Sequence, residues 1–244
     1  MFRIVLLNLG CIASLTITVF LPGLIPIPTL SFTVFTIGFF WCCTYLSACA
    51  LSVKTLSNYQ TFSFTDFQAN LKTGWLAGIA AGFAGLFLFV ITRIIIPFYL
   101  NMESTIWLLP AAVIFWTLAL AVASFQFFFS IRARLDTTIW NTAKKCLVIF
   151  FDNPGFAVFC LLLTLVTFIL SAFLVFLLPG PAGILLFLDE ALRLRLLKYD
   201  WQTRNPPLNS ATKRRTVPWD IILNEEKEKT GTRSLRSFIF PWKD

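Results

Sequence analysis

The last apolar segment, residues 181–198, carries charged side chains that could bind a ligand or an ion. Asp189 precedes Arg193 by four residues and Glu190 precedes it by three, so on a helix either acid can pair with the arginine. A helix that begins near Pro181 places Asp189 roughly 12 Å along its axis, near the middle of a bilayer. An isolated charge there costs about 2.5–3.5 kcal/mol, so these residues must pair with each other or face water.

The charged cluster allows three interpretations. In the first, the segment crosses the membrane and Asp189 and Glu190 line a polar cavity, where they contact a cation, a proton or a polyol. In the second, a half-helix enters from the outside, and Arg193, Arg195 and Lys198 reach the cytoplasmic headgroups. In the third, the charges form a structural network that holds the segment to the other helices.

The sequence has few residues of the kinds that act in catalysis or bind metals. Its 244 residues include no histidine, the commonest general base and a frequent metal ligand. All six cysteines lie in apolar stretches without the CxxC spacing of metal or redox sites, which is typical of small buried side chains. We therefore expect no catalytic residue, no metal and no cofactor, and we expect that the protein is not an enzyme.

The composition is that of a membrane protein. Hydrophobic residues make up 57% of the chain and charged residues 13%, and the mean hydropathy is +0.79. Five apolar runs can cross a bilayer as helices, namely residues 2–21, 30–52, 73–97, 105–131 and 156–178. With segment 181–198 they predict an all-α, polytopic membrane protein. Its six-helix transmembrane domain spans residues 1–200, and a basic cytoplasmic tail spans residues 201–244.

The positions of the basic residues predict the topology. Lysines and arginines lie before the first run, between the second and third, between the fourth and fifth, and after Leu192, whereas Glu103 is the only charge between the third and fourth. Because cytoplasmic loops retain basic residues, both termini are expected on the cytoplasmic side of an inner membrane. This arrangement requires an even number of crossings, which favours six.

Two cytoplasmic loops have amphipathic patterns. Residues 63–72 begin with a serine and an acid that can cap a helix and then place Phe67 and Leu71 on one face. Residues 136–145 repeat this with Ile139 and Ala143. We expect each to form an interfacial elbow that leads into the next span.

A glycine stripe marks the third run, where Gly74, Gly78 and Gly82 recur every four residues and Gly85 lies on nearly the same face. Such a stripe lets another helix approach closely, which matters because lipid gives no hydrophobic drive for helix association. We expect it to pack mainly against another helix of this chain. Packing against a second copy, which would make a homo-oligomer, is the alternative.

Arg93 falls on the same face as Gly82 by helical phase and lies near the outer end of the third run. One interpretation is an anchor whose long side chain reaches the headgroups and pairs with Glu103. The other is a role in an outward-facing solute cavity.

The tail has a basic run at residues 213–215, and residues 233–244 alternate basic residues with aromatic ones. This composition favours binding to an anionic inner leaflet of the lipid bilayer. A short helix is expected from Pro218, with Trp219 and Leu223 on its apolar side. Acids interrupt the basic runs, so we expect no nucleic-acid binding.

Several short motifs occur together between residues 2 and 199: Asn8-Leu9, Phe64-Thr65-Asp66-Phe67-Gln68-Ala69-Asn70, Arg134-Leu135-Asp136, Thr142-Ala143-Lys144-Lys145 and Asn153-Pro154. In these motifs the chain resembles the YesL-type family of bacterial membrane proteins. The resemblance implies a six-helix protein often encoded beside carbohydrate transport genes, with ABC transporter permease subunits as candidate partners. The charged last segment and the long tail depart from the family pattern.

The resemblance and the composition together predict an accessory protein of carbohydrate uptake that performs no covalent chemistry. The alternative is a small-solute or ion transporter that uses Asp189, Glu190 and Arg193.

Overall fold

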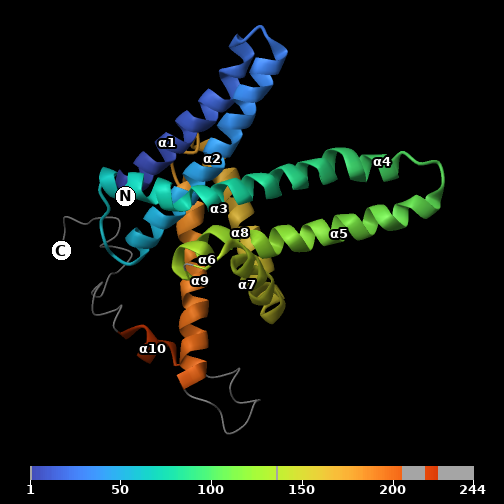
Figure 1. Ribbon diagram of the computed structural model, residues 1–244. Coiled ribbons are helices and arrows are strands. Elements are labelled where there is room, and N and C mark those ends of the chain that lie inside the picture. Colours follow the sequence, from blue (N-terminus) through green and yellow to red (C-terminus); the bar gives the residue numbers. More distant parts are fainter. Residues whose placement is uncertain (1, 136, 205–217, 225–244) are drawn as a thin grey trace. The chain divides into compact units, whose positions relative to one another are not determined.

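The computed structural model describes residues 2–135, 137–204 and 218–224, and most of these residues are helical (Figure 1). No strand occurs within those ranges, so the predicted all-α class is confirmed. The chain divides into two units, Met1–Leu192 and Arg193–Asp244. The basic motifs predicted to bind the inner leaflet, residues 213–215 and 233–244, lie outside the described residues.

The helices follow one another with short connections. Their bounds are α1 Phe2–Phe20, α2 Pro28–Ser57, α3 Phe64–Val90, α4 Ile96–Leu100, α5 Leu108–Phe125, α6 Phe128–Leu135, α7 Ile139–Asp152, α8 Pro154–Phe173, α9 Gly180–Arg204 and α10 Trp219–Ile222. Three short elements, η1 Pro22–Leu24, the π-helix η2 Ile91–Ile95 and η3 Thr105–Trp107, join some of them. The helix expected after Pro218 is therefore present as α10.

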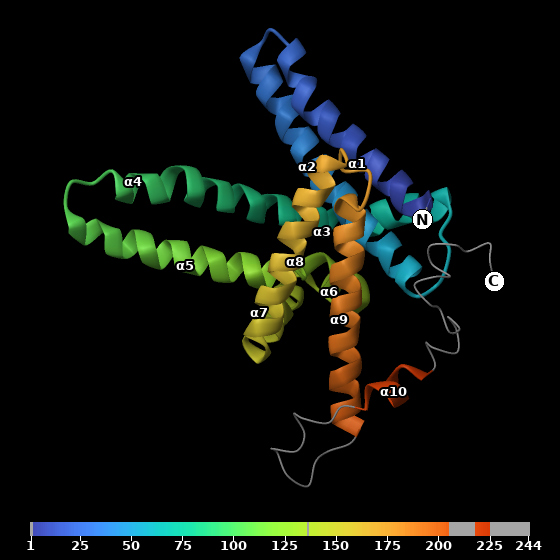
Figure 2. The same cartoon turned by 180° about the vertical axis from the view of Figure 1, so that it is seen from behind.

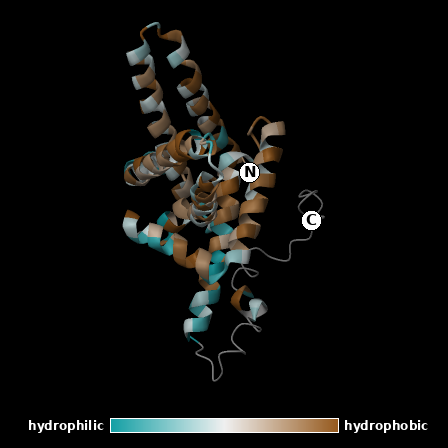
Figure 3. Ribbon diagram, turned by 90° about the vertical axis from the view of Figure 1, so that its right-hand side faces the viewer, coloured by the Kyte–Doolittle hydropathy of each residue, from teal (hydrophilic) through white to brown (hydrophobic). Residues whose placement is uncertain are grey.

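Five of the described helical segments are long and apolar enough to cross a membrane. They contain the first four predicted runs and residues 156–173 of the fifth, which was expected to continue to residue 178. They are Phe2–Leu24, Pro28–Ser57, Phe64–Leu100, Thr105–Leu135 and Pro154–Phe173. Apolar residues cover much of their surface (Figure 3), as expected of helices in contact with lipid. The sixth segment is helical, as α9, but its charges keep it out of this group, so its crossing stays a prediction.

Prolines separate α1 from α2. Pro22 starts the single turn η1, and Pro28 occupies the first turn of α2, where its missing N–H is harmless. The two helices return side by side as a hairpin, visible from both sides (Figures 1 and 2). Near its base, the phenol of Tyr45 donates a hydrogen bond to the carbonyl of Leu7 at 3.1 Å.

The glycine stripe of α3 lies against α2. A methyl group added to Gly78 would be 2.3 Å from Cα of Thr44, and one added to Gly82 would be 2.6 Å from the ring of Phe40. A methyl group added to Gly74 would be 2.8 Å from the hydroxyl oxygen of Ser47. The stripe therefore packs within the chain, and the two backbones meet at Thr44 because Gly78 has no side chain.

The two predicted elbows differ in the structure. Residues 64–72 form the first turns of α3 itself, because nothing breaks the helix after the capping box in which the Ser63 hydroxyl accepts from the Asp66 amide. Residues 139–152 form a separate helix, α7, which starts at Thr138 and ends before Pro154. Asp136, the predicted start of the second elbow, lies outside the described residues.

A break between α5 and α6 sets the direction of the segment that carries Arg134. The side-chain amide of Gln126 donates to the carbonyls of Ala123 and Ala157, at 2.8 and 2.7 Å. The second bond ties this break to α8. Phe127 is fully buried beside it, with its ring stacked on Phe156.

Candidate functional site

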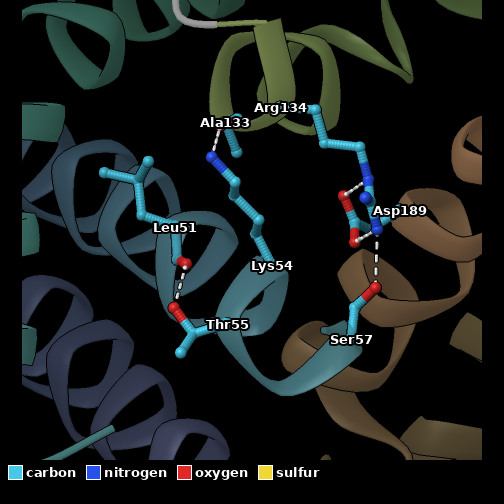
Figure 4. Close-up of polar contacts among 7 residues, drawn as sticks. All are labelled: Leu51, Lys54, Thr55, Ser57, Ala133, Arg134 and Asp189. Carbon is cyan, nitrogen blue, oxygen red and sulfur yellow. Dashed lines mark hydrogen bonds and ion pairs between the residues drawn. The ribbon is translucent and has the colours of Figure 1, made fainter. Parts of the chain in front are cut away.

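A buried ion pair joins α6 to α9 (Figure 4). Arg134 donates from Nε to Oδ1 of Asp189 at 2.8 Å and from Nη2 to the other carboxylate oxygen. The Asp189 side chain is 2% exposed. This two-pronged geometry is the strongest arrangement that an arginine and a carboxylate can form, and it compensates both charges away from water.

The end of α2 completes this network. Nη2 of Arg134 also donates to the hydroxyl of Ser57 at 2.6 Å. Lys54, one turn earlier on α2, donates from Nζ to the carbonyl of Ala133 at 2.8 Å, in the last turn of α6 (Figure 4). A cation at that position is favourable because the last carbonyls of a helix carry partial negative charge. We call Lys54, Ser57, Ala133, Arg134 and Asp189 the α2–α6–α9 clasp.

For Asp189 the clasp favours the third interpretation, a network of charges that holds the last segment to the other helices. Both carboxylate oxygens are occupied by Arg134, so they do not line an open cavity. Sequence spacing suggested Arg193 as a partner of Asp189 or Glu190, and this pairing stays a prediction. The two bonds from Arg134 were not predicted. In the sequence, Arg134 was noticed as a topology signal and as part of a short motif. Its contact with Asp189 could have been suspected only because a buried acid needs a cation.

Glu190 has a different environment from its neighbour. It is half-buried and lines an open cavity of about 580 Å³. The other polar residues on the wall are Arg3, Ser57, Tyr59 and Thr61. Consecutive helical residues differ by 100° in direction, which explains why Asp189 enters the clasp while Glu190 reaches the cavity.

The remaining walls of the cavity are apolar. They are formed by Phe2, Ile4, Leu56 and Leu186. The first turn of α1, the end of α2, the loop after it and the middle of α9 thus enclose one space. Only Glu190 of the residues proposed from the sequence as ligand contacts lines it.

Arg3 supplies the positive charge of the cavity wall. Its guanidinium lies over the ring of Phe62, 5.5 Å from the ring centre, a cation–π contact. One of its nitrogens, Nη1, is buried and has no hydrogen-bond partner among the described residues. Gln126, Ser130 and Thr164 also carry a buried polar atom without a partner among the described residues, so this nitrogen does not by itself mark a ligand site.

Tyr59 has an unusual backbone conformation at the cavity. The helix α2 ends with Tyr59 N donating to Leu56 O and Gln60 N donating to Thr55 O, the pattern in which glycine usually occupies the left-handed position. Tyr59 adopts that conformation with φ of 60°. The strain is tolerated at a residue whose side chain lines the cavity.

Comparison of the chain with models of known protein families, with curated proteins and with solved structures gave no match. The resemblance to the YesL-type family therefore stays a prediction from the short motifs. The function has to be inferred from the geometry of the clasp and the cavity.

Arg93 lies far from this arrangement in the chain and is exposed. It occupies the π-helix η2 four residues before Pro97, whose ring would collide with the Arg93 carbonyl in a regular α-helix. Glu103 is also exposed, and no ion pair joins it to Arg93 in the described part of the chain. The buried face of Gly82 does not continue to Arg93, so neither predicted role is supported by contacts.

Asn8 fixes the beginning of α9 and was noticed in the sequence only as part of a motif. Its side chain is fully buried, and its Nδ2 donates to the carbonyls of Leu177 and Pro179 at 2.9 and 2.8 Å. Its Oδ1 accepts from the amide of Ala182 at 2.8 Å. Gly180, with φ of 61°, leaves the space that the Asn8 amide fills, since a methyl group there would lie 2.4 Å from it.

The cysteines show the environment expected of structural residues. Cys146 on α7 is fully buried, and burial raises the pKa of its thiol to about 12. A protonated, buried thiol is a poor nucleophile and metal ligand. No group of three His, Cys, Asp or Glu residues in the described ranges is placed to hold a metal ion.

Proposed function

We propose that the chain is a multi-pass accessory protein of a bacterial inner membrane that acts by binding other proteins and performs no covalent chemistry. Both termini lie on the cytoplasmic side, and its partners are permease subunits of a carbohydrate ABC transporter. The closed state of Asp189 is the observation that carries the choice of an accessory over a transporter.

The argument rests on what a transported ion requires. A carboxylate that carries a cation or a proton must exchange it with water during each cycle. Asp189 is buried and bound by two nitrogens of Arg134, and Arg134 is held in turn by Ser57. Opening this pair would leave two uncompensated charges in a dry environment, which is strongly unfavourable. A fixed clasp suits a protein that keeps one arrangement.

The exposed helical hairpin from α3 to α5 supports a partner in the membrane. In the most apolar stretch of Phe64–Leu100, only 6% of the residues are buried within the chain. In the corresponding stretch of Thr105–Leu135, 11% are buried. Large side chains such as Phe87 and Trp116 are exposed along it. Lipid covers such a surface by default, and another membrane protein can replace lipid by close packing. The choice of a sugar permease comes from the family resemblance.

Co-purification tests the proposal. The tagged protein is expressed at native level, extracted in a mild detergent after brief crosslinking, and the bound proteins are identified by mass spectrometry. We expect the permease subunits of a carbohydrate transporter to be enriched over a tagged control protein with the same number of apolar helices. Absence of any permease in the crosslinked fraction would refute the accessory role.

Glu190 favours a second function, that of a small-solute or ion transporter, because this acid lines a cavity together with Arg3. The residue that contacts the solute or ion would then be Glu190, because Asp189 is held by Arg134. Uptake into liposomes that contain only this protein, lost in Glu190→Gln and kept in Glu103→Gln, would establish it. Equal leakage from liposomes with and without the protein would exclude it.

A further inference from the structure

The cavity beside Glu190 combines charges of both signs with apolar walls. Arg3 and Glu190 both lie on its lining, and Tyr59 and Thr61 add two hydroxyl groups. Its volume of about 580 Å³ falls within the range of small-molecule sites, roughly 300–1,000 Å³. A ligand with one charge would be attracted by one of these residues and repelled by the other. A ligand with both charges is complementary to the pair.

The positive side of the cavity suits a phosphate. Arg3 lies on the lining, and a guanidinium offers a planar fork that matches phosphate oxygens. The first residues of α1, Phe2 to Ile4, form this wall, so the positive end of a 19-residue helix dipole adds to the attraction.

The negative side suits a cation that can donate hydrogen bonds. A carboxylate has about four acceptor positions, so Glu190 can bind an ammonium in addition to a protein contact. A primary ammonium donates three N–H bonds, whereas a quaternary ammonium donates none. The acid therefore favours an ethanolamine-type group over a choline-type group.

The apolar part of the wall and the position in the chain point to an amphiphile. Phe2 is 75% exposed and Tyr59 is 55% exposed, and both line the cavity at the ends of membrane-length helices. Aromatic side chains at such ends typically lie at the level of lipid headgroups. Leu56 and Leu186 continue the apolar surface beside them.

We propose that this cavity binds a zwitterionic phosphoethanolamine group, with the phosphate beside Arg3 and the primary ammonium beside Glu190. The group belongs to a phospholipid of the bilayer or to a soluble phosphoethanolamine. This site is independent of the proposed accessory function and stands if no permease is found.

Lipid retention by the full-length protein tests the site. The protein is reconstituted in nanodiscs that contain equal amounts of phosphatidylethanolamine, phosphatidylcholine and phosphatidylglycerol, and is then extracted gently for native mass spectrometry. We expect phosphatidylethanolamine to be retained at least about fivefold over the other two lipids, since bonds to charged groups are the strongest discriminators. Glu190→Gln should abolish the preference for phosphatidylethanolamine over phosphatidylcholine. Arg3→Gln should reduce the retention of both phosphatidylethanolamine and phosphatidylcholine.

Matched controls separate the site from general charge effects. Glu103→Gln and Arg93→Gln remove an exposed acid and an exposed base outside the cavity, and both should keep the wild-type preference. Leu186→Phe fills the cavity without changing a charge and should also abolish retention. It keeps the proposal testable if a charge variant fails to fold.

Two further results would overturn the proposal, and a competition experiment identifies the source of the ligand. Equal retention of the three lipids by the wild type, or an unchanged preference in Glu190→Gln and Leu186→Phe, would overturn the proposal. Displacement of the lipid by millimolar O-phosphoethanolamine would support the site with a soluble source. Retention of the lipid in its presence would support the site with a phospholipid source.

Discussion

Arg134 on α6 and Asp189 on α9 stand 55 residues apart in the chain and form one two-pronged ion pair. Ser57 binds the same guanidinium from the end of α2, so three helices meet at one charge. Asp189, the acid that the sequence suggested for ion transport, therefore holds helices together. The following predictions test this clasp and the contacts that position it.

Removing one half of the pair should be costly. We expect Asp189→Asn to lower the free energy of unfolding by about 3–5 kcal/mol, because it leaves the Arg134 charge buried without a counter-ion. The double variant Arg134→Leu/Asp189→Leu should recover most of this loss, since it buries no charge. Thermal unfolding in detergent measures both. Equal destabilisation by the single and the double variant would contradict the clasp.

The glycine stripe can be tested with a single methyl group. Gly78→Ala should destabilise the protein by about 1–3 kcal/mol, because its Cβ would collide with the backbone of Thr44. Gly155→Ala is the matched control, since nothing lies within 4 Å of its added methyl group, and it should gain up to about 1 kcal/mol. Chemical unfolding of the two variants should therefore shift in opposite directions. A stabilised Gly78→Ala protein would show that α2 and α3 are further apart.

The Asn8 side chain should control the connection between α8 and α9. Asn8→Ala removes two donated bonds and one accepted bond at once, and it leaves the carbonyls of Leu177 and Pro179 and the buried amide of Ala182 without their partner, a loss of about 3 kcal/mol or more. Limited proteolysis should then cut residues 174–180 at a protease concentration that leaves the wild type intact. Asn101→Ala, at an exposed asparagine, should leave the digestion pattern unchanged. Resistance of Asn8→Ala to cleavage would exclude this role.

Cys146 should react slowly and show a defined pH dependence. Burial raises its pKa from 9.0 to about 12, so a chain that keeps only this cysteine should hold about a thousandfold less thiolate at pH 8 than an unfolded chain. Between these two values the unfolded state binds fewer protons than the folded state, so stability falls as pH rises. Alkylation rates with and without denaturant from pH 8 to pH 11 measure this. Equal rates at pH 8 would refute the burial of the thiol.

Local features of the fold could be predicted from the sequence. The helices of the five apolar runs, the break at Pro22 and Pro28, and the cap at Ser63 depend on residues close together in the chain. The glycine stripe was also visible, because its spacing of four is a local pattern. Residues 63–72 were expected to form a separate elbow, because their composition is more polar than that of the following run. They continue into α3 instead, since a change from polar to apolar composition does not by itself break a helix.

The site could be predicted only in part. Glu190 was proposed as a ligand contact and does line a cavity, but Arg3, which also lines it, was interpreted solely as a topology signal. Arg134 reaches Asp189 because the helix is interrupted at Gln126, whose side chain donates hydrogen bonds to α5 and α8. The sequence has no proline or glycine there that would predict this interruption. Such long-range pairs depend on how helices are placed, and a single sequence contains little information about that.

The contacts of Asn8 also have a consequence for the biogenesis of the protein. Its hydrogen-bond partners Leu177 and Pro179 are separated from it by 169 and 171 residues, so they leave the ribosome long after α1 has been made. During that interval an amide that ends up fully buried has none of its final partners, and hydrocarbon offers no substitute. We therefore expect insertion to be most favourable when α1 stays in a polar environment, or at the lateral gate of the insertion machinery, until the connection before α9 has been made.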